Sequence, residues 1–366
     1  MKRINSNKIS KIVRCIIFIL VFVFCFNYIS YVLRPVSPEE IGFKSFYAEK
    51  KNTLDVIYIG GSVCIVDWVP YTAWAGQGIT SYAYGKSTLY SFNVLPLVKE
   101  ALQYQSPDLF VIDLRPFEYT GTERSVTKSN FLSLASSMPF FSPNRQQILR
   151  NGYTYASDLD ENDTELSFYM DLIRYHGQWK SIGEPSFGYA IPGQHSNNTK
   201  GYLFINKHES IVLNDNSDIS EKMPCPANAE DNLRELISYL TSINKKAVFV
   251  VAPYQETIEQ RKQYNYLAEI IKDNGFDYIN ANDFYYQMGM DETRDFYNVD
   301  HTNIFGADKY TEFLSNYLIT YYDLPDRRKD EEYANYWNEG YTTWIEQSNQ
   351  VKSEIEQLIA DSYLAQ

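Results

Sequence analysis

Two short segments of the chain carry side chains that could perform nucleophilic chemistry. The first is Asp55-Val-Ile-Tyr-Ile-Gly-Gly-Ser62, in which an apolar, β-branched run ends in two glycines and a serine. The second is Asn298-Val-Asp-His301, which offers an imidazole near the far end of the chain. A serine hydroxyl is a weak nucleophile until a base takes its proton, so Ser62 and His301 together would suit acyl transfer.

The elements around these segments predict how two distant parts of the chain could meet. Leu54–Ile59 has the composition of a buried strand, and the glycines after it permit a tight exit that presents the serine. Further strands are predicted at 78–84, 107–113, 246–252 and 276–279, and helices at 91–104, 230–243, 264–274 and 306–317. Strands alternating with helices predict a parallel sheet, at whose carboxyl edge the functional loops gather.

Ser62 and His301 would both lie at that edge. Gly85, which follows the second strand, could offer its backbone N–H to a developing oxyanion. Taken singly, each signal has a plainer interpretation: a strand followed by Gly-Gly-Ser is also an ordinary turn, and a lone loop histidine is often structural or solvent-facing. Their order along the chain, nucleophile after the first strand and base before the last helix, favours the catalytic interpretation.

Residues 12–33 are predicted to form a transmembrane helix. The segment is almost wholly apolar, and basic residues cluster between Lys2 and Arg14. By the positive-inside rule, residues 1–11 would be cytoplasmic and everything after Arg34 would lie on the outer side of the membrane. A cleaved signal peptide is the alternative, but no small-residue cleavage site follows the apolar run. An exterior domain would not meet ATP or NAD, no Walker loop or GxGxxG is present, and we expect no cofactor.

The remaining chain divides into four predicted parts. Residues 34–53 are expected to form a stalk and lead-in, residues 54–325 an α/β domain, and residues 326–366 a C-terminal amphipathic helix. Within the domain, residues 120–228 are polar and lack the α/β rhythm, so they predict an insertion that caps the sheet edge, with a helix at 165–175. The apolar stripe of the tail, which includes Trp337, Trp344 and Ile355, predicts docking onto the domain, with a partner subunit or a membrane surface as the alternative.

Composition restricts the class of function. The 366 residues, 44% of them hydrophobic, suffice for one large domain plus an appendage. A net charge of -13 without a basic patch in the soluble part argues against a nucleic-acid partner. Aromatic residues reach 16%, which would suit a sugar-facing groove, although core packing is their commoner use. Cys64 and Cys225 stand outside the apolar segment; their pairing stays open, and no ligand spacing predicts a metal site.

Several motifs together resemble a known family. They are Phe46-Tyr47, the Asp55–Ser62 segment with Pro70 downstream, Ile79-Thr-Ser-Tyr-Ala-Tyr-Gly85, the strand Leu109–Asp113, and Asp300-His-Thr-Asn-Ile-Phe-Gly306. Over roughly residues 42–324 the chain is similar to the SGNH (GDSL-like) hydrolase superfamily, in the membrane-anchored bacterial branch of D-alanine transfer proteins and polysaccharide O-acetyltransferases.

The resemblance implies a fold and a set of site residues. The fold would be an α/β, flavodoxin-like (SGNH-type) three-layer sandwich with a central parallel sheet, an inserted cap region, an N-terminal transmembrane helix and a C-terminal helix. Ser62 would be the nucleophile and His301 the base, and Gly61 and Gly85 would serve the oxyanion or substrate.

Two positions depart from the family pattern. The family expects an aspartate three residues before the histidine, where this chain has Asn298, and many members have a histidine directly after the serine, where Val63 stands. Asparagine can orient an imidazole but does not offset the charge of an imidazolium. Asp300 or Asp295 could supply the missing carboxylate.

These observations predict a single-pass cell-membrane protein with an extracellular main domain. We expect an esterase or O-acyltransferase that acts on acyl esters of cell-wall polysaccharide or exopolysaccharide, with a membrane-bound O-acyltransferase as a possible partner. The alternative is a degenerate SGNH domain that binds a glycan or such a partner without turnover.

Overall fold

A parallel β-sheet forms the centre of the domain. The computed structural model describes residues 6–118, 126–197 and 199–364, and within them the sheet has five strands in the order β2-β1-β3-β4-β5. The strands are β1 (Val56–Gly60), β2 (Ser81–Gly85), β3 (Leu109–Asp113), β4 (Lys246–Val251) and β5 (Asp277–Asn280), all paired in parallel. This is the flavodoxin-like order of a doubly wound sheet, so the predicted α/β class with a parallel sheet is confirmed.

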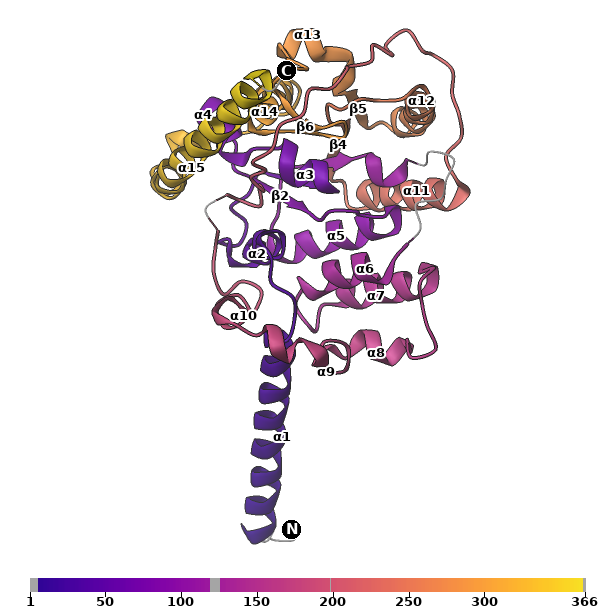
Figure 1. The fold of residues 1–366 in the computed structure, drawn as a ribbon. Coiled ribbons are helices and arrows are strands. Elements are labelled where there is room, and N and C mark those ends of the chain that lie inside the picture. The colour runs from indigo at the N-terminus through magenta and orange to yellow at the C-terminus, as the bar shows by residue number, and fades with distance from the viewer. Residues whose placement is uncertain (1–5, 119–125, 198, 365–366) are drawn as a thin grey trace.

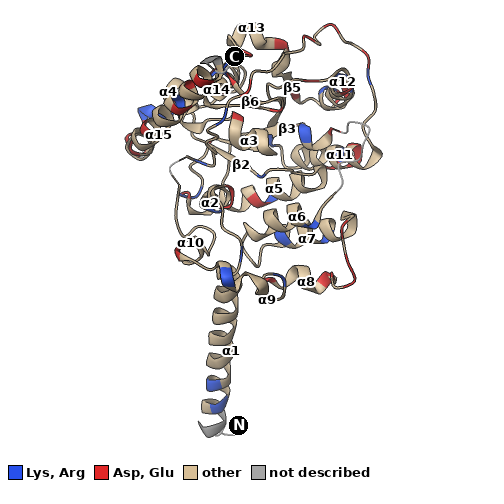
Figure 2. Cartoon of the chain, in the orientation of Figure 1, with Lys and Arg blue, Asp and Glu red and all other residues tan. Residues whose placement is uncertain are grey.

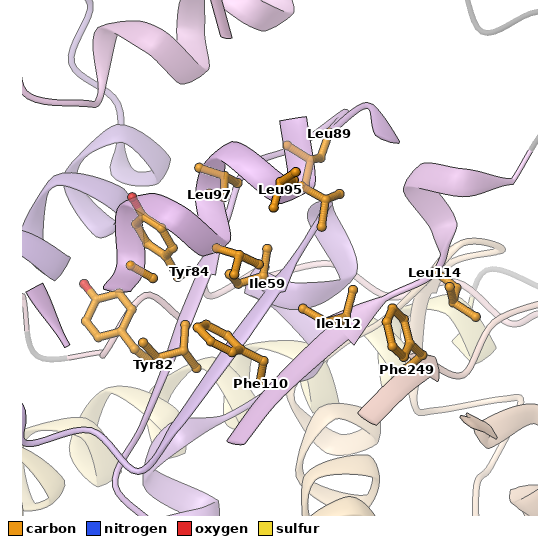
Figure 3. Close-up of a cluster of buried hydrophobic side chains, with 14 of the residues drawn as sticks. Ile59, Tyr82, Tyr84, Leu89, Leu95, Leu97, Phe110, Ile112, Leu114 and Phe249 are labelled. Atoms are coloured by element: carbon orange, nitrogen blue, oxygen red, sulfur yellow. The ribbon is translucent and has the colours of Figure 1, made fainter. Parts of the chain in front are cut away.

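Helices cover both faces of the sheet, which gives three layers (Figure 1). One face packs against α5 (Ser91–Tyr104), α11 (Ala227–Ser242) and α12 (Ile258–Asp273). The other packs against α3 (Ser62–Asp67), α13 (Tyr285–Met288) and α14 (Ile304–Tyr321). Alternate residues of β1 enter the two cores, Ile57 and Ile59 one and Val56 and Tyr58 the other, because a central parallel strand is buried on both faces. Figure 3 shows the first core, where Ile112 of β3 lies between Ile59 of β1 and Phe249 of β4.

Helix α12 begins six residues earlier than the sequence predicts. Thr257 accepts a hydrogen bond from the Gln260 backbone N–H, and the Gln260 side chain accepts one from the Thr257 N–H. This capping box satisfies two N–H groups that otherwise lack partners at a helix start, so the helix opens at Ile258 instead of Tyr264.

The insertion has two parts with different structures. Its first part is helical: α6 (Lys128–Ser136), α7 (Pro143–Tyr155), α8 (Glu165–Tyr169), α9 (Asp171–Arg174), the 3-10 turn η3 (His176–Ser181) and α10 (Glu184–Gly188). The helix expected at 165–175 is broken at Met170, and residues 119–125, where the insertion was predicted to begin, lie outside the described residues. Helix α7 packs on the outer side of α5, and α6 packs against α7 (Figure 1), so these helices do not cap the sheet edge.

The second part of the insertion is an extended segment that follows the carboxyl edge of the sheet. The Leu203 N–H donates to the Ile65 carbonyl (2.6 Å), and the Glu209 N–H donates to the Phe296 carbonyl (3.1 Å). Farther on, the side-chain amide of Asn216 donates to the Glu256 carbonyl (2.8 Å). Within the described residues of the insertion, the part that contacts this rim is the extended segment.

Residues 34–53 do not form the predicted stalk. They fold into α2 (Pro38–Ser45) and η1 (Phe46–Ala48), which are part of the domain, and Phe43 and Phe46 lie in its core. The helix starts where Ser37 accepts a hydrogen bond from the Glu40 N–H, with proline at the first helical position. The apolar side chains after the start pull the segment into the domain.

Helix α1 (Ser6–Val32) projects from the domain (Figure 1). Its stretch Ile9–Val32 is long and apolar enough to cross a membrane. Figure 2 shows basic residues near its amino end, where Lys11 and Arg14 lie, and an uncharged stretch up to the domain. Residues 1–5 of the predicted cytoplasmic segment lie outside the described residues.

The C-terminal helix α15 (Glu331–Leu364) lies along α4 (Pro70–Gln77) and α14. Trp337, Trp344 and Ile355 of its apolar stripe are buried in the core. Trp337 stacks on Trp74 with ring centroids 5.4 Å apart. The tail therefore docks onto its own domain.

Candidate active site

Ser62 and His301 meet at the carboxyl edge of the sheet. Ser62 is the first residue of α3, directly after β1 and the glycine pair. Its Oγ lies 2.6 Å from Nε2 of His301, although the two residues are 239 positions apart in sequence. Both side chains are partly exposed to solvent.

A short hairpin holds His301 beside Asn298. Strands β6 (Phe296–Asn298) and β7 (His301–Thr302) are antiparallel, and Asn298 is the residue paired with His301 across them. The Asn298 Oδ1 lies 3.0 Å from His301 Nδ1. Asn298 thus occupies the place of the third member of a Ser-His-Asp arrangement.

The backbone of Asp300 fixes which end of the Asn298 amide faces the histidine. The Asp300 N–H donates to the same Oδ1 (2.9 Å), and an N–H donor requires an acceptor there. The amide oxygen is therefore the atom next to His301, so Nδ1 carries the proton and donates it. Nε2 is then left as the acceptor for the Ser62 hydroxyl, which is the tautomer that a general base needs.

The ring of Tyr297 stacks on the His301 imidazole. Its ring lies nearly parallel to the His301 ring, with an interplanar angle of 8° and centroids 5.1 Å apart. No motif in the sequence predicted a role for Tyr297. Its position directly before Asn298 is the only signal, because a stacked pair leaves no pattern in sequence.

Both candidate replacement carboxylates bind cationic side chains. The Asp300 Oδ1 accepts from Nη2 of Arg115 (2.8 Å), and the Asp300 carbonyl accepts from Nη1 (2.8 Å). The Asp295 Oδ2 accepts from Nζ of Lys309 (2.6 Å). The contribution of Asp300 to the site is therefore its backbone N–H, which orients the Asn298 amide. Arg115 holds this turn in place through its bonds to the Asp300 carbonyl and carboxylate.

Asp67 is a further positioning residue that the sequence analysis missed. It ends α3 and is fully buried, and its Oδ1 accepts from the Thr302 N–H (3.1 Å) and hydroxyl (2.7 Å). Burial raises the pKa of the Asp67 carboxyl well above its ordinary value, and the bonds from Thr302 act in the opposite direction. One element, α3, therefore holds Ser62 at its start and the neighbour of His301 at its end.

Close packing, and not a left-handed backbone, explains two of the glycines. A Cβ on Gly60 would lie 2.5 Å from Cβ of Asp113, and a Cβ on Gly85 would lie 2.5 Å from the Gly60 carbonyl oxygen. A Cβ on Gly61 would meet Asp113 only at 3.6 Å, an ordinary contact. Gly60 and Gly85 allow β1, β2 and β3 to converge beneath Ser62.

The backbone N–H groups of the two predicted oxyanion glycines are oriented differently. The Gly61 N–H donates to Oδ2 of Asp113 (3.1 Å). The Lys86 N–H donates to the Gly60 carbonyl, and because successive N–H groups of a strand alternate in direction, the Gly85 N–H points away from β1. The Ser62 and Val63 N–H groups open α3, where a helix supplies no internal acceptor.

Asp113 connects the glycine pair to the Arg115 turn. Besides the Gly61 N–H, it accepts the Arg115 N–H at Oδ1 (3.0 Å). Burial raises the pKa of this carboxyl to about 6, although both backbone bonds act to lower it. Asp113 therefore gains a proton more readily than an exposed aspartate.

Within residues 6–118, 126–197 and 199–364, no group of three His, Cys, Asp or Glu side chains is arranged to hold a metal ion. Cys64 and Cys225 are both buried free thiols, which settles the pairing that the sequence left open.

Comparison with known proteins identifies no relative. No family model, no curated protein and no solved structure matches the chain.

Proposed function

We propose that the chain is a membrane-anchored, extracytoplasmic SGNH-like esterase or O-acyltransferase that acts on acyl esters of cell-envelope polysaccharide. The observation that carries the proposal is the 2.6 Å hydrogen bond between Ser62 Oγ and His301 Nε2, with Asn298 behind the imidazole. The sheet order and the place of the pair at the carboxyl edge agree with the SGNH resemblance.

The proposed reaction begins with proton transfer from Ser62 to His301 Nε2. The Ser62 oxygen forms a bond to the carbonyl carbon of the ester, and the carbonyl oxygen becomes an oxyanion. Collapse of this intermediate breaks the bond to the alcohol oxygen, which takes the proton from His301 and leaves. A sugar hydroxyl or water then attacks the acyl-serine by the same steps in reverse, which regenerates Ser62.

The oxyanion requires donors close to Ser62. In this proposal the N–H groups of Ser62 and Val63 at the start of α3 supply them, because the Gly61 N–H is engaged by Asp113. Gly85 keeps its predicted oxyanion role only if its N–H turns toward the substrate.

Asn298 makes the proposed enzyme slower than one with a full triad but does not disable it. In a serine protease, replacing the triad Asp by Asn lowers kcat by roughly ten-thousand-fold because the amide selects the wrong histidine tautomer. Here the Asp300 N–H keeps the amide oxygen on Nδ1, so that loss does not arise. What remains absent is the negative charge that would stabilise the imidazolium.

The site of action follows from α1. In the proposal the helix crosses the cell membrane with its amino end in the cytoplasm, and the domain faces the envelope. Acyl esters of wall polysaccharide or exopolysaccharide are then the accessible substrates, and a membrane-bound O-acyltransferase is a candidate partner.

A fluorophosphonate probe tests the proposal on the full chain in detergent or nanodiscs. We expect labelling of the wild type, no labelling of Ser62→Ala and strongly reduced labelling of His301→Ala. The matched control is Ser242→Ala, an exposed serine on the last turn of α11, which should label like the wild type. An unlabelled wild type, or equal labelling of Ser62→Ala, would exclude a nucleophilic Ser62.

The neutral Asn298 also supports a second candidate, a domain that binds a glycan or a membrane acyltransferase without turnover. This candidate predicts an unlabelled wild type that still retains O-acetylated wall fragments on a column. Release of acetate from those fragments by the wild type would exclude it.

A further inference from the structure

We propose that four exposed apolar side chains around the end of α1 form a membrane-contact surface, seated in the headgroup region of the bilayer. This exit surface consists of Phe141, Ile173, Trp179 and Phe187. It rests on the proposed role of α1 as the membrane anchor, and it adds a second membrane contact through the insertion.

The four side chains are unusually exposed for residues of their type. The exposed fractions are 74% for Phe141, 49% for Ile173, 59% for Trp179 and 48% for Phe187. They come from four separate pieces of the insertion: the turn before α7, helix α9, the turn η3 and helix α10. Large apolar side chains that gather on one surface mark a contact with another molecule or with lipid.

Each of these pieces borders the carboxyl end of α1. The Phe140 N–H donates to the Tyr31 hydroxyl (2.8 Å), which places Phe141 next to the helix. Helix α9 packs against α1. Residues 32–36 share a cavity of about 300 Å³ with Gln178 and Ser181 on either side of Trp179 and with Pro185 and Ser186 of α10, which brings the segment of Trp179 and the start of α10 to the same point.

A buried ion-pair cluster makes the junction between α1 and the insertion rigid. The Arg34 Nη2 lies 2.6 Å from Oδ2 of Asp171, and Arg145 binds the other oxygen of the same carboxylate at 2.7 Å. The Nη1 of Arg34 donates to the carbonyls of Ser136 and Met138. All three charged side chains are buried, so the domain cannot swing on a flexible linker and the exit surface stays beside the helix.

Continuity with α1 identifies lipid as the occupant. Residues 9–25 of the apolar stretch are exposed and only its last turns, at Ser30 and Val32, are buried by the domain, so in the proposal the bilayer covers the stretch up to this junction. The exit surface starts where that stretch ends, at the depth where Trp and other aromatic side chains concentrate in membrane proteins.

Trp179 allows a direct test, because it is the only exposed tryptophan of the five. Trp68, Trp74, Trp337 and Trp344 are each 2% exposed or less. The full chain is reconstituted in phosphatidylcholine vesicles, and in matched vesicles whose lipid is brominated high on the acyl chains. The Trp179→Phe variant serves as the reference that lacks the reporter.

We expect the emission difference between wild type and Trp179→Phe to fall about two-fold or more in the brominated vesicles, because interfacial groups sit about 5–10 Å into the headgroup and acyl boundary. Aqueous iodide should quench this difference only weakly. Strong iodide quenching without an effect of bromine would show that Trp179 faces water or a missing protein partner, and would overturn the inference.

The failure of the inference is distinguishable from that of the proposed function. A chain that does not float with vesicles refutes the anchor and the exit surface together. A chain that floats but shows no bromine effect refutes the exit surface alone. Fluorophosphonate labelling of Ser62, measured on the same vesicles, reports separately on the chemistry.

Discussion

Restoring a carboxylate behind His301 is the sharpest test of the site. In Asn298→Asp the new charge would occupy the position of Oδ1, 3.0 Å from Nδ1, and the Asp300 N–H could donate to it as it does now. The variant should hydrolyse p-nitrophenyl acetate faster than the wild type, because the carboxylate stabilises the imidazolium that forms in the transition state.

The size of the gain follows from electrostatics. Two unit charges about 4 Å apart interact by about 4 kcal/mol at an effective dielectric constant near 20. The pair is partly exposed, so solvent screening reduces this to about 1.5–3 kcal/mol. That corresponds to a rise in kcat/KM of about 10- to 150-fold. The gain is smaller than the roughly ten-thousand-fold loss caused by the wrong histidine tautomer in a serine protease, because the Asp300 N–H already holds His301 in the correct tautomer here.

Two further variants complete the test. Asp300→Ala keeps the backbone N–H that orients Asn298, and it should keep the tautomer while loosening the Arg115 clamp. Asn298→Ala removes the acceptor and should lower kcat/KM. Steady-state hydrolysis is measured for each variant with the Ser62→Ala background subtracted. An Asn298→Asp rate at or below the wild-type rate would refute the role assigned to Asn298.

Other predictions concern stability, measured by unfolding of the full chain in detergent. Gly60→Ala should cost about 1–3 kcal/mol because its Cβ would overlap Asp113, whereas Gly61→Ala, which has room, should be nearly neutral; equal costs would contradict the packing argument. Trp337→Ala should cost about 3–5 kcal/mol because the side chain is buried, and a near-zero cost would show that α15 is not docked. Because folding raises the pKa of Asp113 to about 6 from 3.8, its protonated form stabilises the fold below about pH 4, and this contribution is lost as the pH rises through 6. Asp113→Asn should therefore gain about 3 kcal/mol relative to wild type between pH 4 and 7, and parallel pH curves would exclude this assignment.

The sequence predicted the sheet because its strands are continuous apolar runs, as buried parallel strands must be. The proximity of Ser62 and His301 could also be predicted. Ser62 follows β1 and His301 lies in the loop before the last helix of the sheet domain, and such loops gather at the carboxyl edge of a parallel sheet. Asn298 was assigned to the third position through the SGNH resemblance, which expects an aspartate three residues before the histidine. The pairing of Asn298 with His301 across the hairpin explains why a residue at that spacing reaches the imidazole.

Other features could not be predicted, because they depend on contacts between residues far apart in sequence. The Arg115 bond to Asp300 spans 185 positions, and the Arg34 bond to Asp171 spans 137. Without the second contact, Pro35 and its polar neighbours look like a linker. The close packing of Gly60 against Asp113 could not be predicted either. In the sequence, a glycine pair suggests a need for unusual backbone angles and not a lack of space for a side chain.

The docking of α15 has a consequence for the order in which the chain is made. Tyr71 and Trp74 near the amino end are covered by Trp337 and Trp344 of the last helix. During synthesis these rings stay exposed until the ribosome has added helix α15. A chain truncated before Glu331 would still contain Ser62 and His301. Its aromatic rings at Tyr71 and Trp74 would stay exposed, however, and chaperones and quality-control proteases recognise such apolar surface.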